Sequence, residues 1–173
     1  MNILQEFKPI KLFVLDVDGV LTNGSLLLLE NGQWARFMNI KDGFALQLAI
    51  KKGYQVLVIS GAFDEAVRIR LNKLGINEVA QGVTNKKSLL SSFVEKNNFT
   101  TEQVLYMGDD MPDLEVMGIV GLPCCPADAV SEIKAISSYI SNYKGGEGCV
   151  RDVIEKVLKL NDDWDSGTSI ASR

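Results

Sequence analysis

The sequence predicts a doubly wound α/β domain, in which a parallel β-sheet carries helices on both faces. Two observations predict it: short runs that are apolar on both faces recur along the chain, and helical patterns alternate with them. Strands that alternate with helices are typical of parallel sheets, and continuously apolar runs are typical of strands covered on both faces. The chain has 173 residues, and we expect a single domain over residues 1–160.

The expected strands are five short apolar runs, each bounded by glycine, a charged residue or a turn residue. They cover residues 12–15, 56–59, 79–80, 104–107 and 119–122. The expected helices cover residues 43–52, 64–74, 86–97, 129–136 and 150–160. Residues 161–173 are polar, and we expect a frayed tail there.

Residues 24–38 break this alternation and predict a projecting β-hairpin. Asn31-Gly32 lies between two strand-like runs and favours a type I′ turn. The first run contains four consecutive leucines, Leu26 to Leu29, so both of its faces are apolar. A hairpin cannot bury both faces against its own small domain. We therefore expect an oligomer interface, while a strand with one face merely exposed is the other interpretation.

Composition and charge exclude several classes of protein. The formal net charge is −4, which gives no electrostatic basis for binding nucleic acid or an anionic membrane. No apolar run approaches the roughly 20 residues that span a bilayer, and the first residues lack the apolar stretch of a signal peptide. We therefore expect a cytoplasmic protein without nucleic-acid or membrane partners.

Cysteine and histidine usage narrows the possible chemistry. The three cysteines, Cys124, Cys125 and Cys149, are odd in number, which is typical of reduced and buried residues in the cytoplasm. The chain has no histidine and no Cys-x-x-Cys pair, which argues against a zinc site and excludes the usual catalytic triads. Carboxylates must therefore carry any acid–base chemistry.

Polar side chains follow the ends of four expected strands. They are Asp16 and Asp18 after the first, Ser60 and Gly61 after the second, Lys86 after the third, and Asp109, Asp110 and Asp113 after the fourth. Because parallel strands end at one edge of a sheet, these groups converge there. Two carboxylates about 4 Å apart repel by roughly 4 kcal/mol at an effective dielectric constant near 20, so a cation is needed among them. All-oxygen ligands favour Mg²⁺. Helix capping is the alternative role for any single aspartate, but a group of them at two strand ends argues against it.

The motifs resemble those of a known superfamily. Residues 16–22 read Asp-Val-Asp-Gly-Val-Leu-Thr, which resembles the first motif of the haloacid dehalogenase superfamily phosphatases. Ser60, Lys86 and the segment 108–113 resemble the second, third and fourth motifs, in the same order. The resemblance covers nearly the whole chain and implies the Rossmann-like core of that superfamily.

The resemblance also implies a role for each acidic residue. Asp16 would attack phosphorus and form an aspartyl-phosphate, while Asp18 would protonate the leaving alkoxide and later activate water. Asp109 would bind Mg²⁺ together with the Asp16 carboxylate and the Asp18 backbone carbonyl. Asp113 would orient these ligands, and Asp110 would either orient them or bind the ion.

The remaining motif residues are implied to hold the phosphoryl group. Ser60, Gly61 and Lys86 would contact its oxygens, with the lysine countering the charge that builds up during transfer. Lys87 is the competing cation, but the position of Lys86 matches the family's third motif. On this basis Lys87 belongs to a solvated helix face.

The spacing of the motifs leaves no room for a separate cap domain. The stretches between Asp16 and Ser60 and between Ser60 and Lys86 hold only the hairpin and single helices. Five segments resemble a capless branch, the 3-deoxy-D-manno-octulosonate 8-phosphate phosphatases: residues 16–24, 39–43, 66–76, 121–128 and 145–151. This resemblance implies hydrolysis of a sugar-acid phosphate in lipopolysaccharide precursor synthesis. It also implies a homotetramer in which a neighbouring subunit helps to close each site.

One position departs from that branch. Many of its members have arginine after the Ser/Thr-Gly pair, where this chain has Ala62. Arg70 is the candidate for binding the sugar-acid carboxylate, although an arginine on a helix is often only solvated. A nonulosonate 9-phosphate (of KDN or an N-acylneuraminate) is therefore the alternative substrate.

Two other classes of function fit these residues less well. A phosphoacceptor signalling domain also has a doubly wound sheet with an acceptor aspartate and a lysine around Mg²⁺. Such domains lack a second aspartate two residues after the acceptor, where this chain has Asp18. A catalytically idle assembly scaffold built on the hairpin would not need the full set of acids.

Overall fold

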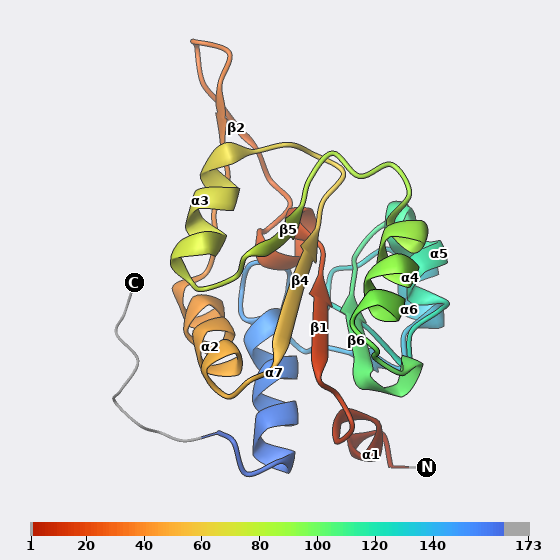
Figure 1. The fold of residues 1–173 in the computed structure, drawn as a ribbon. Helices are drawn as coiled ribbons and strands as arrows, with labels where there is room; N and C mark the ends of the chain where they lie inside the picture. The colour runs from red at the N-terminus through yellow and green to blue at the C-terminus, as the bar shows by residue number, and fades with distance from the viewer. Residues whose placement is uncertain (1, 165–173) are drawn as a thin grey trace.

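A six-stranded parallel sheet organises the molecule, which the computed structural model describes over residues 2–164 (Figure 1). The strand order is β5-β4-β1-β6-β7-β8, and every neighbouring pair runs parallel. The strands are β1 (Leu12–Leu15), β4 (Gln55–Ile59), β5 (Glu78–Ala80), β6 (Val104–Met107), β7 (Leu122–Cys125) and β8 (Tyr139–Ile140). Strands β4 and β6 flank β1 on opposite sides, so the chain reverses its winding direction there. The predicted fold class is confirmed.

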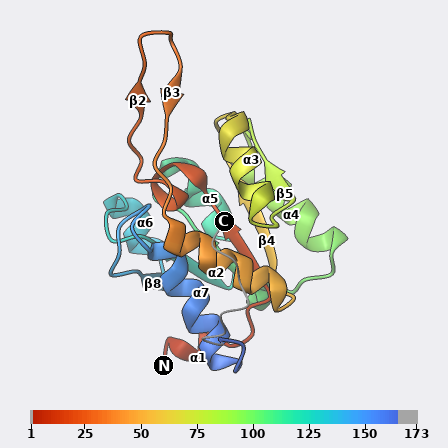
Figure 2. The same cartoon turned by 90° about the vertical axis from the view of Figure 1, so that its left-hand side faces the viewer.

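Helices cover both faces of this sheet, as Figures 1 and 2 show. One face carries α1 (Leu4–Phe7), α2 (Ile40–Lys51), α3 (Glu65–Lys73) and α7 (Cys149–Leu160). The other carries α4 (Lys86–Lys96), α5 (Leu114–Met117) and α6 (Ser131–Ile136). Successive side chains of β1 point into two separate cores: Phe13 and Leu15 into the first, Leu12 and Val14 into the second. Burial on both faces is the reason that β1 is apolar at every position.

Helices α2 and α7 illustrate how the sequence specifies this packing. The buried stripe of α7 recurs every three or four residues and comprises Val150, Val153, Ile154, Val157 and Leu158. At the beginning of α7 the Arg151 N–H donates to Asp42 Oδ1 of α2 at 2.7 Å. A carboxylate at this end of the helix stabilises the first turn, so Asp42 helps to fix α7 against α2.

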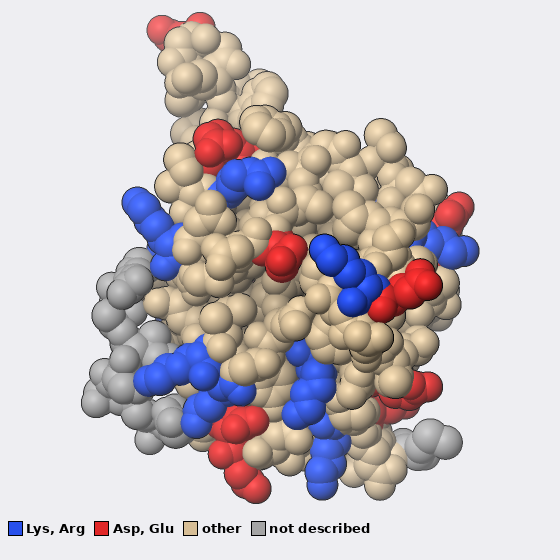
Figure 3. All heavy atoms as spheres, viewed as in Figure 1, with Lys and Arg blue, Asp and Glu red and all other residues tan. Residues whose placement is uncertain are grey.

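The hairpin projects from the chain that leaves the carboxyl end of β1 (Figures 1 and 2). Its strands, β2 (Leu27–Leu28) and β3 (Trp34–Ala35), pair antiparallel. The side chains are largely exposed, with Leu28 at 74% and Phe37 at 62%. Figure 3 shows that the projecting surface is mostly uncharged apart from acidic atoms at the tip. The hairpin therefore presents apolar surface that its own domain does not cover.

The turn of the hairpin is not the predicted type I′ turn. That type needs positive φ at both central residues, whereas the non-glycine residues with positive φ in residues 2–164 are Asn98 and Asp162. Gly32 has φ +79°, and its N–H donates to Leu29 O at 3.0 Å. The Asn31 side chain accepts from Gln33 N at 3.0 Å. This local contact lets Asn31 keep a negative φ, so Gly32 alone occupies the left-handed region.

Two strand predictions need correction at the far edge of the sheet. The run 119–122 was expected as a strand, but β7 begins where that run ends, at Leu122. Pro123 lies inside β7 although it has no N–H to donate, and its carbonyl accepts from Ser138 N at 2.9 Å. Strand β8 was missed because it is only two residues long.

The frayed tail is the other correction. In residues 161–164 the Tyr54 hydroxyl donates to Asp163 Oδ2 at 2.8 Å, and Trp164 packs edge-on against Phe44. These contacts join the tail to α2 and to the residue before β4, so the tail is packed at least to Trp164. Residues 165–173 of the predicted tail lie outside the described residues. Over residues 2–164, none of the helices is both long enough and apolar enough to cross a membrane.

Candidate active site

A cavity of about 370 Å³ opens where β1, β4 and β6 end, and it gathers most of the predicted site residues. Its lining comprises Asp16, Asp18, Gly24, Ser60, Gly61, Ala62, Val83, Thr84, Lys86, Asp109, Asp110 and Pro112. Asp113 lies directly behind this lining and is completely buried. The convergence predicted from the strand ends is therefore what the fold produces.

Asp16 begins a tight loop, residues 16–24, which we call the β1 loop. Its Oδ1 accepts from Val17 N at 2.7 Å, which orients the carboxylate at the end of β1. Gly19 adopts φ +85°, and a Cβ added there would lie 1.9 Å from Asp109 Oδ2. The Thr22 hydroxyl accepts from Gly19 N and Gly24 N at 3.3 and 3.2 Å. Only glycine permits this approach of the loop to Asp109.

A buried ion network lies under the cavity. Lys86 Nζ is 3.0 Å from Asp16 Oδ1 and 2.8 Å from Asp113 Oδ1, and its side chain is 5% exposed. Asp113 also accepts from the Tyr106 hydroxyl at 2.7 Å and from Asp109 N at 3.2 Å. Both oxygens of Asp113 are thus engaged by the protein. This arrangement favours an orienting role for Asp113 and places Lys86, rather than the exposed Lys87, at the site.

The electrostatics of the cluster call for a cation. Burial, followed by the nearby Asp113, raises the pKa of Asp16 to about 7. Burial, followed by Asp16 and Asp113, raises the pKa of Asp109 to about 7. Burial alone would lower the pKa of Lys86, but Asp16 and Asp113 outweigh it and raise that pKa above its ordinary value. One lysine thus faces three carboxyl groups, and keeping all three ionised together needs further positive charge.

The geometry of the same carboxylates fits a hard metal ion. One oxygen from each of Asp16, Asp109 and Asp113 lies within 4.8 Å of the others. Asp109 Oδ1 is buried and has no hydrogen-bond partner among the described residues. An all-oxygen donor set with an unpartnered buried oxygen suits Mg²⁺. Because the protein already engages both oxygens of Asp113, Asp16 and Asp109 are the better candidates for ligands.

Asp18 lies at the rim of the cavity and is held by a residue that sequence reasoning missed. Arg36 Nε lies 2.6 Å from Asp18 Oδ1, and Arg36 Nη2 lies 3.3 Å from Asp18 Oδ2. Arg36 Nη1 reaches Asp64 Oδ2 at 2.5 Å. No local signal could have found this contact, because it joins residues 34–38, the hairpin stem, to the β1 loop across 18 positions.

The phosphate-binding candidates Ser60 and Gly61 line the same cavity. Ser60 follows β4 and is 3% exposed, and its hydroxyl accepts from Ala62 N at 3.1 Å. Gly61 and Ala62 line the cavity beside it. Asp110 is exposed and caps the short helix Met111–Asp113, accepting from Met111 N at 2.7 Å. Asp110 therefore has a helix-capping contact in addition to its place at the cavity.

Arg70 does not line the cavity that contains Asp16. It lies in a neighbouring cavity of about 310 Å³ between α3 and the hairpin stem, with Trp34, Arg36 and Met38. Arg36 thus contacts both hollows, since it lines the second and binds Asp18 at the rim of the first. A substrate that contacts Arg70 must extend from the first cavity into the second.

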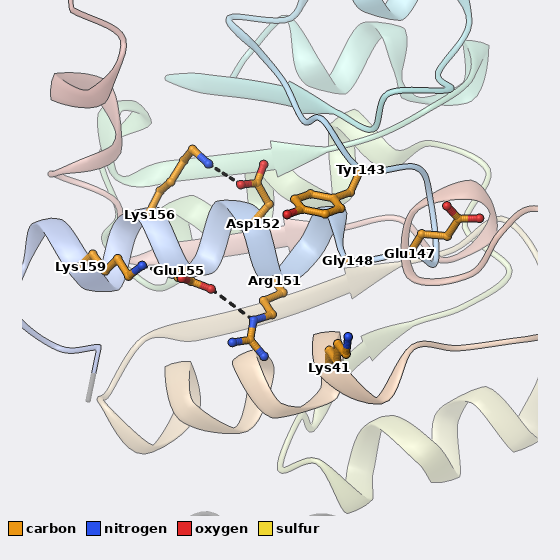
Figure 4. Close-up of a pocket in the computed structure, with 9 residues that line it drawn as sticks. All are labelled: Lys41, Tyr143, Glu147, Gly148, Arg151, Asp152, Glu155, Lys156 and Lys159. Atoms are coloured by element: carbon orange, nitrogen blue, oxygen red, sulfur yellow. Dashed lines mark hydrogen bonds and ion pairs between the residues drawn. The ribbon is translucent and has the colours of Figure 1, made fainter. Parts of the chain in front are cut away.

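A larger cavity of about 580 Å³ lies elsewhere, along α7, and it lacks a comparable constellation (Figure 4). Figure 4 shows its charged residues paired along α7: Arg151 with Glu155, and Lys156 with Asp152. Lys159 also contacts Glu155, at 2.6 Å. These i,i+4 pairs are typical of a helix surface. The volume of a cavity therefore does not identify the active site in this protein, whereas the type of residues that line it does.

Comparisons with known proteins agree with this geometry. A family model described as haloacid dehalogenase-like hydrolase matches residues 59–154. The 3-deoxy-D-manno-octulosonate 8-phosphate phosphatase of Escherichia coli K12 is 34% identical over 157 residues, which cover 91% of this chain and 84% of that protein. The chain belongs to the haloacid dehalogenase-like hydrolase family. It is a phosphatase of that family, as predicted.

Solved structures support the same assignment. The octulosonate 8-phosphate phosphatase of Yersinia pestis superposes with a TM-score of 0.92 and 31% identity, covering 97% of this chain and 91% of that one. The corresponding enzyme of Moraxella catarrhalis has a TM-score of 0.90 and 32% identity, covering 95% and 94%. That structure contains a magnesium ion, a phosphate ion and a KDO molecule. The predicted cofactor is thus confirmed for this group of phosphatases, and the acidic cluster of this chain fits it.

Proposed function

We propose that this phosphatase hydrolyses 3-deoxy-D-manno-octulosonate 8-phosphate to octulosonate and inorganic phosphate, with Mg²⁺ as cofactor. The observation that carries the proposal is the cavity lined by Asp109, Ser60 and the ion pair of Asp16 with Lys86. The relatives supply the substrate: their names specify this sugar-acid phosphate, and one of them was solved with KDO. The reaction would serve lipopolysaccharide precursor synthesis.

The residues of the cavity suggest two chemical steps. In the first, an Asp16 carboxylate oxygen forms a bond to phosphorus while the ester P–O bond breaks, and Asp18 gives its proton to the leaving alkoxide. In the second, Asp18 takes a proton from water, whose oxygen attacks phosphorus and releases phosphate and the free Asp16 carboxylate. Lys86 stays charged throughout and stabilises the negative charge that develops on the phosphoryl oxygens.

Mg²⁺ would be held by Asp16, by Asp109 and by the Asp18 backbone carbonyl. When bound, the ion supplies the positive charge that lets an anionic substrate approach an acidic protein. The unpartnered Asp109 Oδ1 and the raised pKa values of Asp16 and Asp109 support this placement. Asp113 would keep Asp109 and Lys86 in register with the ion through the contacts described above.

The setting of the enzyme is part of the proposal. We infer one phosphatase domain over residues 1–160, with the hairpin assembling a cytoplasmic homotetramer whose neighbouring subunits help to close each site. The exposed leucines of the hairpin support the assembly, because a monomer would leave them in water. The free, buried cysteines suit a reducing compartment.

A phosphate-release screen tests the substrate and the cofactor together. Octulosonate 8-phosphate is expected to be hydrolysed with a higher kcat/KM than nonulosonate 9-phosphates or hexose phosphates, and EDTA should abolish turnover until Mg²⁺ is restored. A preference for a nine-carbon acid would replace the substrate assignment and would fit the absence of an arginine at Ala62. Full activity in EDTA would contradict the role of the metal.

A second prediction concerns residues 145–148, the glycine loop, which packs directly on the β1 loop. A Cβ at Gly145 would lie 1.9 Å from Gly19 O, and Gly146 N donates to Val20 O at 2.9 Å. Gly145→Ala must therefore displace the β1 loop. We expect kcat/KM to fall about 10²-fold, since a displacement near 1 Å costs that much. Thermal unfolding should show a loss of about 1–3 kcal/mol from overpacking.

The matched control is Gly118→Ala. A Cβ at Gly118 would lie 3.5 Å from Glu115 O, an ordinary contact, so activity should be unchanged. Equal activity of the Gly145→Ala and wild-type enzymes would show that the glycine loop does not position the β1 loop.

A further inference from the structure

We propose that Arg36 is a positioning residue that orients Asp18 for proton transfer to the leaving group. The inference rests on the proposed function, because it assigns a partner to Asp18 within that reaction. It concerns a residue of the hairpin stem, which the sequence motifs do not include. The contact also links the hairpin to the catalytic loop.

The geometry of the pair is that of an orienting clamp. Two nitrogens of Arg36 face the two oxygens of Asp18, with Nε–Oδ1 at 2.6 Å and Nη2–Oδ2 at 3.3 Å. This two-point contact sets the plane of the carboxylate as well as its position. The Arg36 side chain is 5% exposed, whereas that of Asp18 is 39% exposed. A buried cation that contacts two carboxylates therefore restricts the rotamers of an acid at the more exposed rim of the cavity.

Arg36 is itself fixed from the backbone side. It directly follows β3, and two positions later Met38 forms an antiparallel bridge with Thr22 of the β1 loop. The hydroxyl of that same Thr22 holds Gly19 N and Gly24 N. The backbone on both sides of Arg36 is thus paired, and one of these pairs is with the loop that carries Asp18.

Arg36 is also fixed through its third nitrogen. Asp64 Oδ1 caps α3 by accepting from Ala66 N and Val67 N, at 2.9 and 3.2 Å. Asp64 Oδ2 remains for Arg36 Nη1, at 2.5 Å. The guanidinium therefore lies between the residue that caps α3 and the catalytic acid.

The leaving group provides a readout that a purely structural role would not change. A sugar alkoxide is a poor leaving group and needs a proton as the P–O bond breaks, whereas 4-nitrophenolate departs without one. For both esters kcat/KM reports the steps up to cleavage of that bond. Mispositioning Asp18 should therefore reduce kcat/KM for the sugar phosphate and spare 4-nitrophenyl phosphate.

The test compares Arg36→Met and Arg36→Lys with wild type on octulosonate 8-phosphate and 4-nitrophenyl phosphate. Because general acid catalysis contributes about 10²–10⁴-fold, we expect Arg36→Met to lose about tenfold or more in kcat/KM on the sugar ester. The aryl ester should be hydrolysed as by wild type. Arg36→Lys should fall between, since an ammonium group cannot make the two-point contact. Arg68→Met removes an α3 arginine that lines none of the three cavities described, and it should leave both esters unaffected.

Asp64→Asn tests the same proposal through the contact between Asp64 and Arg36. Asparagine caps helices as well as aspartate does, so α3 should be retained while the ion pair with Arg36 is lost. We expect a smaller loss, again confined to the sugar ester. The Arg36→Met/Asp64→Asn double variant should be no worse than Arg36→Met alone, because Asp64 acts through Arg36.

The outcomes separate the two proposals. Equal losses on both esters, or no loss on the sugar ester, would overturn the role of Arg36 and leave the proposed function intact. A wild-type enzyme inactive on both esters would overturn the proposed function and this inference with it. Thermal unfolding of each variant identifies any variant that fails to fold. If Arg36→Met does not fold, the kinetics of Arg36→Lys and Asp64→Asn test the role of Arg36.

Discussion

Replacing Asp16 by asparagine is expected to reduce phosphate release on the order of 10⁴-fold or more, because the amide cannot act as the attacking nucleophile. The substitution keeps the shape of the side chain, and its oxygen can still accept from Val17 N and Lys86 Nζ. Measured kcat should therefore collapse without a change in fold. Retention of substantial activity would exclude the covalent route through Asp16.

Stability provides an internal check on that variant. The pKa of Asp16 is raised to about 7 by burial and then by Asp113, so the folded state binds its proton more tightly than the unfolded chain does. In metal-free protein this carboxyl contributes stability at low pH that is lost as the pH rises toward 7. Asp16→Asn removes that loss. In EDTA above pH 7 the variant should unfold at a temperature no lower than wild type.

Two further proteins complete the test of Asp16. Asp162→Asn makes the same chemical change at an exposed residue after α7, and its activity should equal that of wild type. Asp18→Asn should still react with an aryl phosphate but should lack the base for the second step. Mass spectrometry of the acid-quenched Asp18→Asn protein is therefore expected to show phosphate on Asp16.

Replacing Lys86 by methionine is the second change with a large expected effect. The side chain neutralises Asp16 and Asp113 at 3.0 and 2.8 Å while almost completely buried. Removing one partner of a buried ion pair costs about 3–5 kcal/mol, and losing a charge that stabilises the transition state costs about 10²–10³-fold in kcat. Chemical denaturation and steady-state kinetics measure the two losses separately.

Lys87→Met is the matched control, since it removes the same charge one position further along α4. Lys87 is exposed, so both stability and kcat should remain close to wild type. If Lys87→Met were the variant that lost activity, the third motif would be shifted by one residue. The Lys86→Met/Asp113→Asn pair should be more stable than Lys86→Met, because it removes the carboxylate left unpaired.

The sequence predicts the location of a site residue wherever that residue directly follows a strand with a clear apolar pattern. The apolar run of β1 defines where that strand ends, so it places Asp16 and Asp18 at the edge of the sheet. The same argument places Ser60 after β4 and Asp109 after β6. These positions depend on strand boundaries alone, because parallel strands deliver their carboxyl ends to one edge. Mg²⁺ follows from the residue types, since carboxylates without histidine or thiolate ligands favour a hard cation.

Local signals failed where a neighbouring segment decides the outcome. Strand β7 includes Pro123, whose carbonyl accepts from Ser138 N of a distant segment, and β8 itself is too short to predict. The turn at Gly32 depends on the Asn31 side chain, which replaces the backbone geometry expected from the dipeptide. In each case a hydrogen bond to another group determines the backbone conformation more strongly than the intrinsic propensity of the residues does.

By itself, the sequence determined the fold class and the acids at the strand ends, because the periodicity of strands and helices depends on neighbouring residues; Lys86 came from the resemblance of its segment to the third motif. Only the tertiary structure decided that Asp113 lies behind the site, that Gly145 meets the β1 loop and that Arg36 clamps Asp18. These contacts join segments far apart in the chain. The distances between these residues are set when the segments before α7, in the hairpin and after β6 pack around the β1 loop. No pattern of adjacent residues encodes such a distance.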